Sequence, residues 1–320
     1  MKNNILFGII GVGHLGNFHA QQAIQVPNIN VAGVYDVDKK RAKEIAEQYS
    51  VQCFDDMELL LRACDAVSIV TPALSHYNIA MNALKNNCHV FIEKPFTVNL
   101  EDAHKIIIEA KNNNKLIQVG HIERFNPVFT QFIKASPRPL FIEAERLTPF
   151  NKRGTDVDVV LDLMIHDINL ILALLDSKIK SVHANGVSIL SQSSDLVNAR
   201  LEFDNGCIAN LTASRLSVKP LRKLRVFEKN TYSSLDLQKS SIEKYVVLNR
   251  TNSNQDVVFE FENNAVKKES ILIEKQNALY EELVSFSESI QNQQPIEVDG
   301  EDAIKTLELA LLIQQKINEQ

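Results

Sequence analysis

The stretch that decides the fold reads Ile5-Leu6-Phe7-Gly8-Ile9-Ile10-Gly11-Val12-Gly13-His14-Leu15-Gly16. Its first half is an apolar run typical of a buried strand, and its second half has the pattern G-x-G-x-x-G at the start of a helical stretch. In that context the glycines allow a tight turn, a close approach of backbone to a pyrophosphate, and close packing of helix on strand. The helix N-terminus adds unpaired amides that favour phosphate. We therefore predict a dinucleotide-binding loop made by Gly11, Val12, Gly13, His14, Leu15 and Gly16.

Asp36 ends the second predicted strand, at the distance from the glycine loop where a ribose-binding carboxylate is expected. A carboxylate there accepts hydrogen bonds from the adenosine ribose and repels a 2′-phosphate, which favours NAD over NADP. Lys39, Lys40 and Arg41 temper this preference, because basic side chains can accommodate a phosphate. The alternatives are a helix N-cap for Asp36 and a solvated helix face for the three basic residues.

The first 120 residues alternate short apolar runs with helical stretches, a pattern typical of right-handed crossovers in a parallel sheet. The runs are apolar throughout, as expected where helices cover both faces of the sheet. The predicted strands are 5–10, 29–35, 51–54, 66–70, 89–92 and 116–119, and the predicted helices are 15–26, 39–48, 57–62, 75–86 and 100–113. We predict an α/β, doubly wound Rossmann domain over residues 1–120 that binds NAD.

A different pattern follows over residues 121–320, where strands dominate and helices are few. After the polar segment 120–127 we predict strands at 140–146, 182–190, 196–203, 207–214, 224–228, 242–248, 257–261 and 270–273, with helices at 156–175, 278–291 and 301–317. The turn Asp204-Asn205-Gly206 indicates a hairpin between two of the strands. This pattern predicts an α+β domain with a mainly antiparallel sheet and helices on one face.

Composition narrows the class of protein. A chain of 320 residues favours two domains, and 45% hydrophobic with 23% charged residues is ordinary for a globular protein. The net charge of −6 argues against general binding of nucleic acid or anionic membranes. The four cysteines show no paired spacing, which fits a reducing compartment without a zinc knuckle. Without a signal sequence or a long apolar span, we expect a cytoplasmic protein with no membrane partner.

Two further features carry chemistry. Glu93-Lys94-Pro95 follows the strand 89–92, and ligands of open parallel sheets bind beyond the carboxyl ends of strands. Pro95 restricts Lys94 to an extended conformation, which places this lysine where a nicotinamide is expected. The alternative is an ordinary loop lysine before a turn.

The second feature is the helix 156–175, which is apolar around most of its circumference and should therefore be buried. Asp158, Asp162, His166 and Asn169 nevertheless recur at helical spacing and form one polar stripe, with Asp156 and Asp167 on the opposite side. Buried polar groups need partners, so the stripe predicts a helix that lines a polar cleft. Thr155 and Asp158 also match a capping box, which is a structural alternative for Asp158.

The stripe suggests acid–base chemistry. Histidine titrates near neutrality, so His166 can take a hydroxyl proton while a hydride leaves for the nicotinamide, and Lys94 can share that role. A carboxylate one turn earlier, Asp162, can orient the imidazole or the substrate. A metal held by Asp162 and His166 is the less favoured reading because no third ligand has a recognisable spacing.

These motifs together resemble the glucose-fructose oxidoreductase/inositol dehydrogenase (Gfo/Idh/MocA) family. The resemblance rests on the glycine loop, Thr71-Pro72, Glu93-Lys94-Pro95 and Asp162-x-x-x-His166 in the family's order. It implies a Rossmann domain followed by a domain with a large open sheet used for substrate binding and for assembly into a homodimer or homotetramer. It also implies a catalytic trio of Lys94, Asp162 and His166, and cofactor contacts from Thr71, Pro72, His76, Glu93 and Lys94. Asn169 departs from the family, whose members often carry aspartate there.

Segments 120–127 and 154–167 resemble a bacterial subgroup that oxidises UDP-N-acetylglucosamine at its 3-hydroxyl to supply amino-sugar and lipid A precursors. The resemblance implies a nucleotide-sugar substrate, and cationic side chains near the cleft would suit its phosphates. The predicted substrate contacts are Arg124, Asn126, Lys152, Arg153 and Asn169, with a solvated loop as the alternative for Lys152 and Arg153. Two other functions stay open: a dehydrogenase of a free sugar or inositol, and a catalytically silent NAD sensor.

Overall fold

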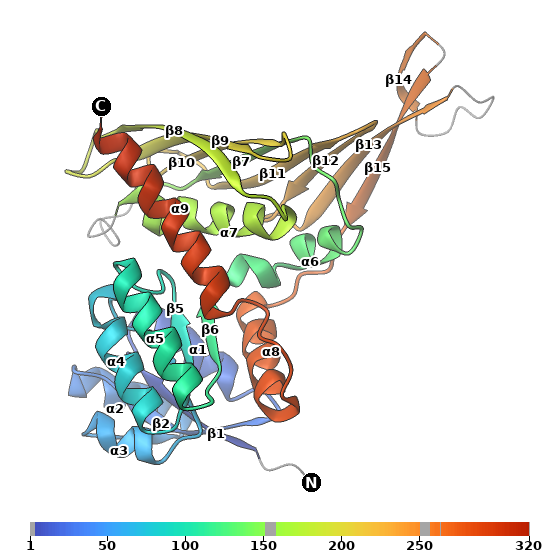
Figure 1. Ribbon diagram of the computed structural model, residues 1–320. Helices are drawn as coiled ribbons and strands as arrows, with labels where there is room; N and C mark the ends of the chain where they lie inside the picture. Colours follow the sequence, from blue (N-terminus) through green and yellow to red (C-terminus); the bar gives the residue numbers. More distant parts are fainter. Residues whose placement is uncertain (1–3, 151–157, 250–256, 263, 320) are drawn as a thin grey trace. The chain divides into compact units, whose positions relative to one another are not determined.

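The computed structural model describes residues 4–150, 158–249, 257–262 and 264–319. The chain forms two compact units (Figure 1). The first comprises Met1–Phe125 and Asn277–Glu308, and the second Asn126–Gln276 and Leu309–Gln320. The predicted domains 1–120 and 121–320 divide the chain once, whereas in the structure residues 277–308 return to the first unit.

The first unit contains a six-stranded parallel sheet in the order β3-β2-β1-β4-β5-β6. This strand order is that of a Rossmann sheet. The order in which successive strands are added reverses between β1 and β4, and dinucleotides bind at this point of a Rossmann sheet. The doubly wound prediction is confirmed. The strands are β1 (Ile5–Ile10), β2 (Ile29–Tyr35), β3 (Gln52–Cys53), β4 (Ala66–Ile69), β5 (His89–Glu93) and β6 (Ile117–Gly120). The helices are α1 (His14–Ala23), α2 (Lys39–Tyr49), α3 (Met57–Arg62), α4 (Ala73–Lys85), α5 (Leu100–Asn112), the 3-10 turn η1 (Ile122–Phe125), α8 (Ala278–Asn292) and the start of α9 (Gly300–Asn318).

Helix α8 is far from the Rossmann strands in sequence yet packs on their sheet. Phe286 of α8 meets Phe7 of β1 and Phe91 of β5 edge-on, with ring centroids 6.5 and 5.9 Å apart. All three rings are buried, and edge-to-face pairs of this kind add to the free energy gained by removing apolar area from water. This aromatic contact explains why the chain returns to the first unit.

The second unit is built on a nine-stranded sheet in the order β14-β15-β13-β12-β11-β7-β10-β9-β8. Only the β7–β10 pair is parallel among its described pairings, which confirms the mainly antiparallel prediction. Helices α6 (Pro127–Ile133) and α7 (Ile165–Leu174) lie on one face of this sheet (Figure 1). The strands are β7 (Phe141–Leu147), β8 (Ile179–Val187), β9 (Leu196–Phe203), β10 (Ile208–Ser214), β11 (Leu221–Glu228), β12 (Thr231–Asp236), β13 (Ser241–Asn249), β14 (Val257–Phe261) and β15 (Asn264–Leu272).

Several elements differ from the sequence predictions. Helix α6 and strand β12 were not predicted, and β15 is longer than the predicted strand at 270–273. Ser233 and Ser234 of β12 are buried polar residues, so this strand lacks the apolar pattern from which strands are predicted. Asn126 accepts a hydrogen bond from the backbone N–H of Val128 and thereby caps α6, so the start of this helix is marked in the sequence by an N-cap residue.

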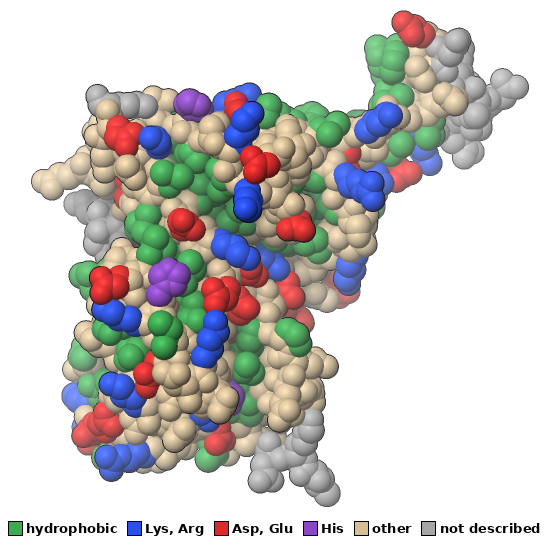
Figure 2. Space-filling view, viewed as in Figure 1, with side chains coloured by type: hydrophobic (Ala, Val, Ile, Leu, Met, Phe, Trp, Pro, Cys, Tyr) green, Lys and Arg blue, Asp and Glu red, His purple; other side chains and the backbone are tan. Residues whose placement is uncertain are grey.

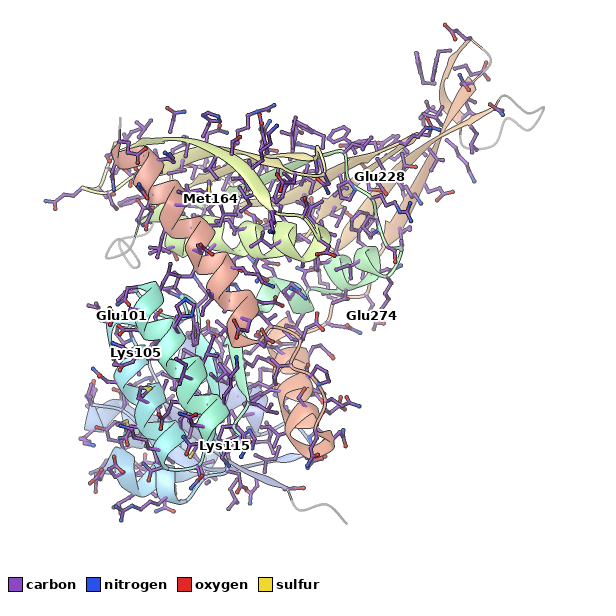
Figure 3. The ribbon with its side chains drawn as sticks, in the orientation of Figure 1. Glu101, Lys105, Lys115, Met164, Glu228 and Glu274 are labelled. Carbon is purple, nitrogen blue, oxygen red and sulfur yellow. The ribbon has the colours of Figure 1, made fainter. Side chains whose placement is uncertain are left out.

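The predicted helix 156–175 is not one continuous α-helix. Its described part has a π-helical segment, η2 (Val160–Met164), which leads into α7. The side chain of Asp158 accepts a hydrogen bond of 2.7 Å from the N–H of Val160. Thr155, the other member of the predicted capping box, lies outside the described residues, as does Asp156. Met164 (labelled in Figure 3) ends η2 and is fully buried in the core of the second unit.

Candidate active site

The glycine loop has the geometry that a dinucleotide site requires. Gly11 has φ +86°, and a Cβ at that position would lie 2.6 Å from the carbonyl oxygen of Val70. A Cβ on Gly16 would overlap the carbonyl oxygen of Gly11, so helix α1 can approach the loop only with glycine there. No described atom lies within 4 Å of a Cβ built on Gly13, which leaves open space beside the helix N-terminus.

The amides around this open space suit an anion. Gly13 is the N-cap of α1, and its position carries no side-chain cap, so helix geometry leaves the first N–H groups of α1 available. The predicted loop residues differ in their exposure. Val12 is buried, whereas Leu15 is exposed and the ring of His14 packs edge-on against Phe18. The loop thus combines a rigid inner side with amides that can receive a pyrophosphate.

Asp36 lies beside this loop. Its Oδ2 accepts a hydrogen bond of 2.7 Å from the N–H of Val12, and its Oδ1 accepts one from the N–H of Asp38. The cap of α2 is Asp38 and not Asp36, which removes the structural alternative for Asp36. Carboxylate oxygens have further lone pairs with which to accept ribose hydroxyls. The Nε of Arg41 donates to the carbonyl oxygen of Val12 at 3.0 Å, so one of the three basic side chains also lies against the loop.

The turns after β4 and β5 are joined by His76. Its Nε2 lies 2.9 Å from the carbonyl oxygen of Thr71, and its Nδ1 lies 3.0 Å from that of Pro95. Pro72 begins α4, and the hydroxyl of Thr71 accepts a hydrogen bond from Ser75. His76 is therefore a buried link between the two turns at the carboxyl edge of the sheet.

Lys94 follows β5 directly, as the sequence predicts. Its backbone N–H donates to Oε2 of Glu93 at 3.2 Å, and Oε1 of the same carboxylate lies 2.9 Å from Nε2 of His19. Glu93 is buried, so the carboxylate turns back into the first unit. Gly120, at the end of β6, lies against it: a Cβ there would be 2.8 Å from Oε1 of Glu93.

These observations test whether the first unit can hold NAD. The open space at Gly13, the available amides of α1 and the carboxylate of Asp36 match a pyrophosphate and a ribose that carries free hydroxyls. The residues present therefore fit the cofactor.

The predicted acid–base residues of the second unit lie on η2 and α7. Asp162 is on the π-helical segment, where its N–H donates to the carbonyl oxygen of Asp158 at 2.9 Å and its side chain is 31% exposed. His166, in the first turn of α7, is half-buried, and Asn169 is buried. π-Helical segments recur at functional sites because they re-aim side chains. This segment thus presents a partly exposed carboxylate and a half-buried imidazole, and the polar cleft that the stripe predicts stays a prediction.

Two arginines around this helix were missed from the sequence. Nη2 of Arg215, a buried residue next to the end of β10, lies 4.0 Å from Oδ2 of Asp162. Arg146 of β7 forms a buried ion pair with Asp167 on the other side of α7. Neither arginine has a local motif, because each meets its partner only through the pairing of strands with the helix. Burial raises the pKa of Asp158, and its hydrogen bonds and Arg215 oppose that shift.

The predicted substrate residues fall into three groups. Nη2 of Arg124 donates to Glu297 at 2.7 Å, and both residues belong to the first unit. In the second unit Asn126 uses both ends of its amide, on Val128 N–H and on the carbonyl oxygen of Leu237. Lys152 and Arg153 lie outside the described residues. Substrate contacts at these positions and at Asn169 therefore stay predictions.

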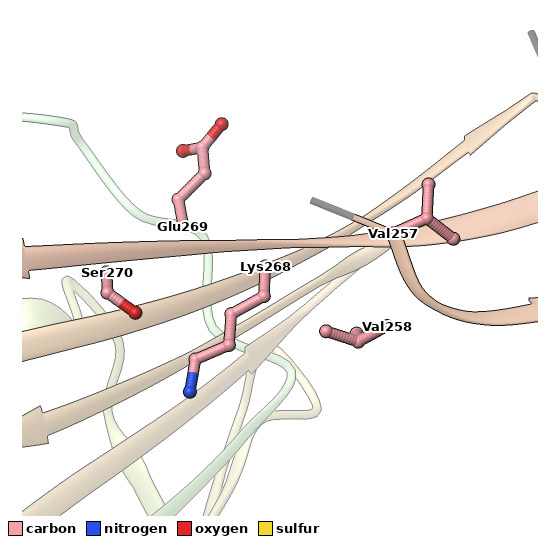
Figure 4. Close-up of a pocket in the computed structure, with 5 residues that line it drawn as sticks. All are labelled: Val257, Val258, Lys268, Glu269 and Ser270. Carbon is pink, nitrogen blue, oxygen red and sulfur yellow. The ribbon is translucent and has the colours of Figure 1, made fainter. Parts of the chain in front are cut away.

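The described chain has further features outside the predicted site. A pocket of about 540 Å³ is lined by Val257, Val258, Lys268, Glu269 and Ser270 of β14 and β15, and none of the predicted site residues contributes to it (Figure 4). Among the described residues, no three His, Cys, Asp or Glu side chains gather as a metal site would require. None of the described helices is both long and apolar enough to cross a membrane. Acidic and basic side chains are interspersed over the face in Figure 2.

Comparison with known proteins agrees with the fold and identifies the family. Residues 5–121 match the model of an oxidoreductase family with an NAD-binding Rossmann fold, and residues 115–230 match the GFO/IDH/MocA C-terminal domain. The fold and the glycine loop with Asp36 thus define an NAD-binding oxidoreductase. The chain belongs to the Gfo/Idh/MocA family.

Individual relatives narrow the comparison. UDP-N-acetylglucosamine 3-dehydrogenase from Acidithiobacillus ferrooxidans is 36% identical over 307 residues, which cover 96% of this chain and 95% of that one. A solved structure of that enzyme has a TM-score of 0.90 and covers 99% of both chains at 34% identity. The scyllo-inositol 2-dehydrogenase (NAD(+)) of Bacillus subtilis is 26% identical over 97% of this chain and 93% of its own.

Proposed function

We propose that this protein oxidises the 3-hydroxyl of UDP-N-acetylglucosamine with NAD, at a step that supplies amino-sugar precursors. The observation that carries the proposal is the 36% identity to a UDP-N-acetylglucosamine 3-dehydrogenase over 96% of the chain. Lys94, Asp162 and His166 are all present, so the residues that acid–base chemistry requires are retained.

We assign the cofactor to the first unit. The amides of α1 at Gly13 would hold the pyrophosphate, and Asp36 would bind the ribose. Thr71, Pro72 and His76 shape the adjoining turns, and Glu93 fixes the backbone of Lys94. NAD, when bound, supplies the oxidising power by accepting a hydride from the carbon that bears the hydroxyl.

We assign proton transfer to Lys94 and His166. Either side chain can accept the proton of the hydroxyl as the carbon is oxidised, and Asp162 orients the acceptor or the sugar through its accessible carboxylate. Arg124, Asn126, Asn169, Lys152 and Arg153 remain the proposed substrate contacts. Of these, Arg124 would bind a diphosphate with guanidinium N–H groups other than the one that it gives to Glu297.

The test is turnover. Purified protein with NAD and UDP-N-acetylglucosamine should produce NADH, and the product should carry a ketone at carbon 3. His166→Ala should lower kcat by about two to four orders of magnitude. His183→Ala is the matched control, because His183 is exposed on β8 of the same unit. An unchanged rate in His166→Ala would refute the role of His166.

Two other functions make different predictions in the same assay. The likeness to scyllo-inositol 2-dehydrogenase favours a free polyol as the alternative substrate, so free inositols and N-acetylglucosamine are assayed beside the nucleotide sugar. Turnover of a free polyol alone would select that alternative. Binding of NAD without turnover of any of these compounds would select an NAD sensor.

We further propose a homodimer or homotetramer assembled through the sheet of the second unit. On the side opposite α7, Phe141, Phe227, Tyr232 and Tyr245 form a row of aromatic contacts across neighbouring strands. Val258 and Phe259 of β14 are exposed, and exposed apolar side chains of this kind favour association. Light scattering should give a multiple of the chain mass, and Tyr232→Lys should lower the measured mass.

We also propose a cytoplasmic location. The four cysteines are all free, which is consistent with a reducing compartment.

A further inference from the structure

A chain of buried polar groups lies beneath the turn that carries Lys94. Oγ of Ser68 on β4 is 2.8 Å from Nδ1 of His19 on α1, and Nε2 of His19 is 2.9 Å from Oε1 of Glu93. Oε2 of Glu93 then accepts the backbone N–H of Lys94. Ser68 and His19 are fully buried.

The direction of these hydrogen bonds follows from the partners. A carboxylate only accepts hydrogen bonds, so Nε2 of His19 donates to Glu93. In that tautomer Nδ1 is an acceptor, and the hydroxyl of Ser68 donates to it. The edge of this arrangement is apolar: the ring of His19 meets that of Phe91 edge-on, with centroids 5.3 Å apart. Such surroundings strengthen a satisfied hydrogen bond and make a broken one costly.

Two neighbours fit this arrangement closely. Gly120 leaves no space for a Cβ beside the carboxylate of Glu93. Glu282 of α8 is fully buried near Glu93, and neither of its carboxyl oxygens has a hydrogen-bond partner among the residues that the structure describes. Burial, and secondarily the charge of Glu93, raises the pKa of Glu282 well above its usual value, which favours the protonated form of Glu282.

We propose that His19 is a positioning residue for the reaction: through Glu93 it fixes the backbone at Lys94, and Gly120 provides the space that this contact needs. No part of His19 touches substrate in this assignment. The inference rests on the proposed role of Lys94. It gives a function to the buried hydrogen bond between His19 and Glu93, a residue for which the family resemblance implies only a cofactor contact.

The test compares two replacements of His19. His19→Leu removes both hydrogen bonds, whereas His19→Gln keeps an N–H donor that can reach Glu93. We expect His19→Leu to lower kcat by about 10- to 100-fold, the range usual for partners that orient a functional residue. His19→Gln should recover most of that loss. NADH affinity, measured by its fluorescence, should stay within about threefold, because the glycine loop and Asp36 are unchanged.

A second measurement does not depend on the substrate. In amide hydrogen exchange the N–H of Lys94 should exchange faster in His19→Leu and in Gly120→Ala, which displaces the Glu93 carboxylate without removing a polar group. Exchange in β1 should not change. Ser68→Ala, which leaves the His19–Glu93 contact intact, should behave as wild type at Lys94.

The outcomes separate the two proposals. If wild type turns over no nucleotide sugar, the proposed function fails, and the exchange at Lys94 still reports on His19. Unchanged exchange at Lys94 in His19→Leu overturns the positioning role. So does an equal loss of activity in His19→Leu and His19→Gln accompanied by an equal loss of thermal stability, because His19 would then serve only the fold.

Discussion

Arg146 donates two hydrogen bonds to the carboxylate of Asp167, at 3.0 and 2.7 Å, and both side chains are buried. The pair joins β7 to α7, and Asp167 directly follows His166 in sequence. A bidentate contact of this kind has one favoured geometry, so it fixes the rotation of α7 about its axis. The direction in which His166 points is thus set by a contact on the other side of the helix.

Arg146→Met should strongly destabilise the protein, because it leaves the Asp167 carboxylate buried without its bidentate partner. We expect a loss of about 3–5 kcal/mol in unfolding free energy, measured by urea denaturation. Arg225→Met is the matched control: Arg225 pairs with Glu145 on the more exposed face of the same sheet and should cost about 0–1 kcal/mol. Equal losses in the two variants would contradict a special role for the buried pair.

Asp36→Asn should change the choice of cofactor. The amide oxygen can still accept the N–H of Val12, but the negative charge that repels a 2′-phosphate is gone. Arg41, which already lies against Val12, is available to such a phosphate. The ratio of kcat/KM for NADP to that for NAD should rise about tenfold or more, equivalent to about 1.4 kcal/mol. Adding Arg41→Ala should remove the gain, and a ratio that does not move would contradict the role of Asp36.

Gly16→Ala should abolish tight binding of the cofactor, because the new Cβ overlaps the carbonyl oxygen of Gly11 and pushes α1 away from the loop. NADH affinity measured by fluorescence should fall by more than about tenfold. The variant should lose NADH binding while it is still folded. Gln21→Ala, on the exposed face of the same helix, serves as the control. Equal affinity in the two variants would show that α1 can shift without harm to the site.

Glu282→Gln should stabilise the protein, and increasingly so as pH rises. The pKa of Glu282 is raised in the folded state, so folding favours its protonated form. The contribution of Glu282 to the free energy of unfolding is therefore fully present below the ordinary pKa of 4.5, and it is lost as pH rises towards the pKa of the folded state. The difference in melting temperature between Glu282→Gln and wild type should grow from about pH 5 to about pH 8.

Glu288→Gln, on the exposed side of α8, is the control for that experiment and should show no such trend. A constant difference between Glu282→Gln and wild type across this range would mean that Glu282 is not held protonated.

Much of the first unit could be predicted because its strands and helices are encoded locally. Apolar runs such as 5–10 and 29–35 become parallel strands wherever helices cover both faces of the sheet. The spacing of the glycines indicates the conformation of the loop that they form. The place of Lys94 in the fold was predictable for the same reason, because it directly follows the strand β5 at the carboxyl edge of the sheet. The return of α8 was not predictable, because Phe286 becomes a core residue only when Phe7 and Phe91 are beside it.

In the second unit the pattern of polar residues was informative but incomplete. The spacing of Asp162 and His166 indicated one helix face, and their helix was found. The π-helical turn at η2 was not predicted, because no residue type demands it. Strand β12 was missed because its buried serines resemble a loop.

The sequence by itself determined the doubly wound Rossmann domain and the glycine loop with Asp36, and it predicts the acid–base residues. These depend on neighbours in the chain: a turn that only glycine can make, a strand end, a helical repeat. Only the tertiary structure decided which charges are neutralised and which side chains are held in place. Arg146 meets Asp167, and His19 meets Glu93, across elements far apart in sequence. Such pairs form because burying a polar group requires a partner, and the folded chain alone determines which partner is near.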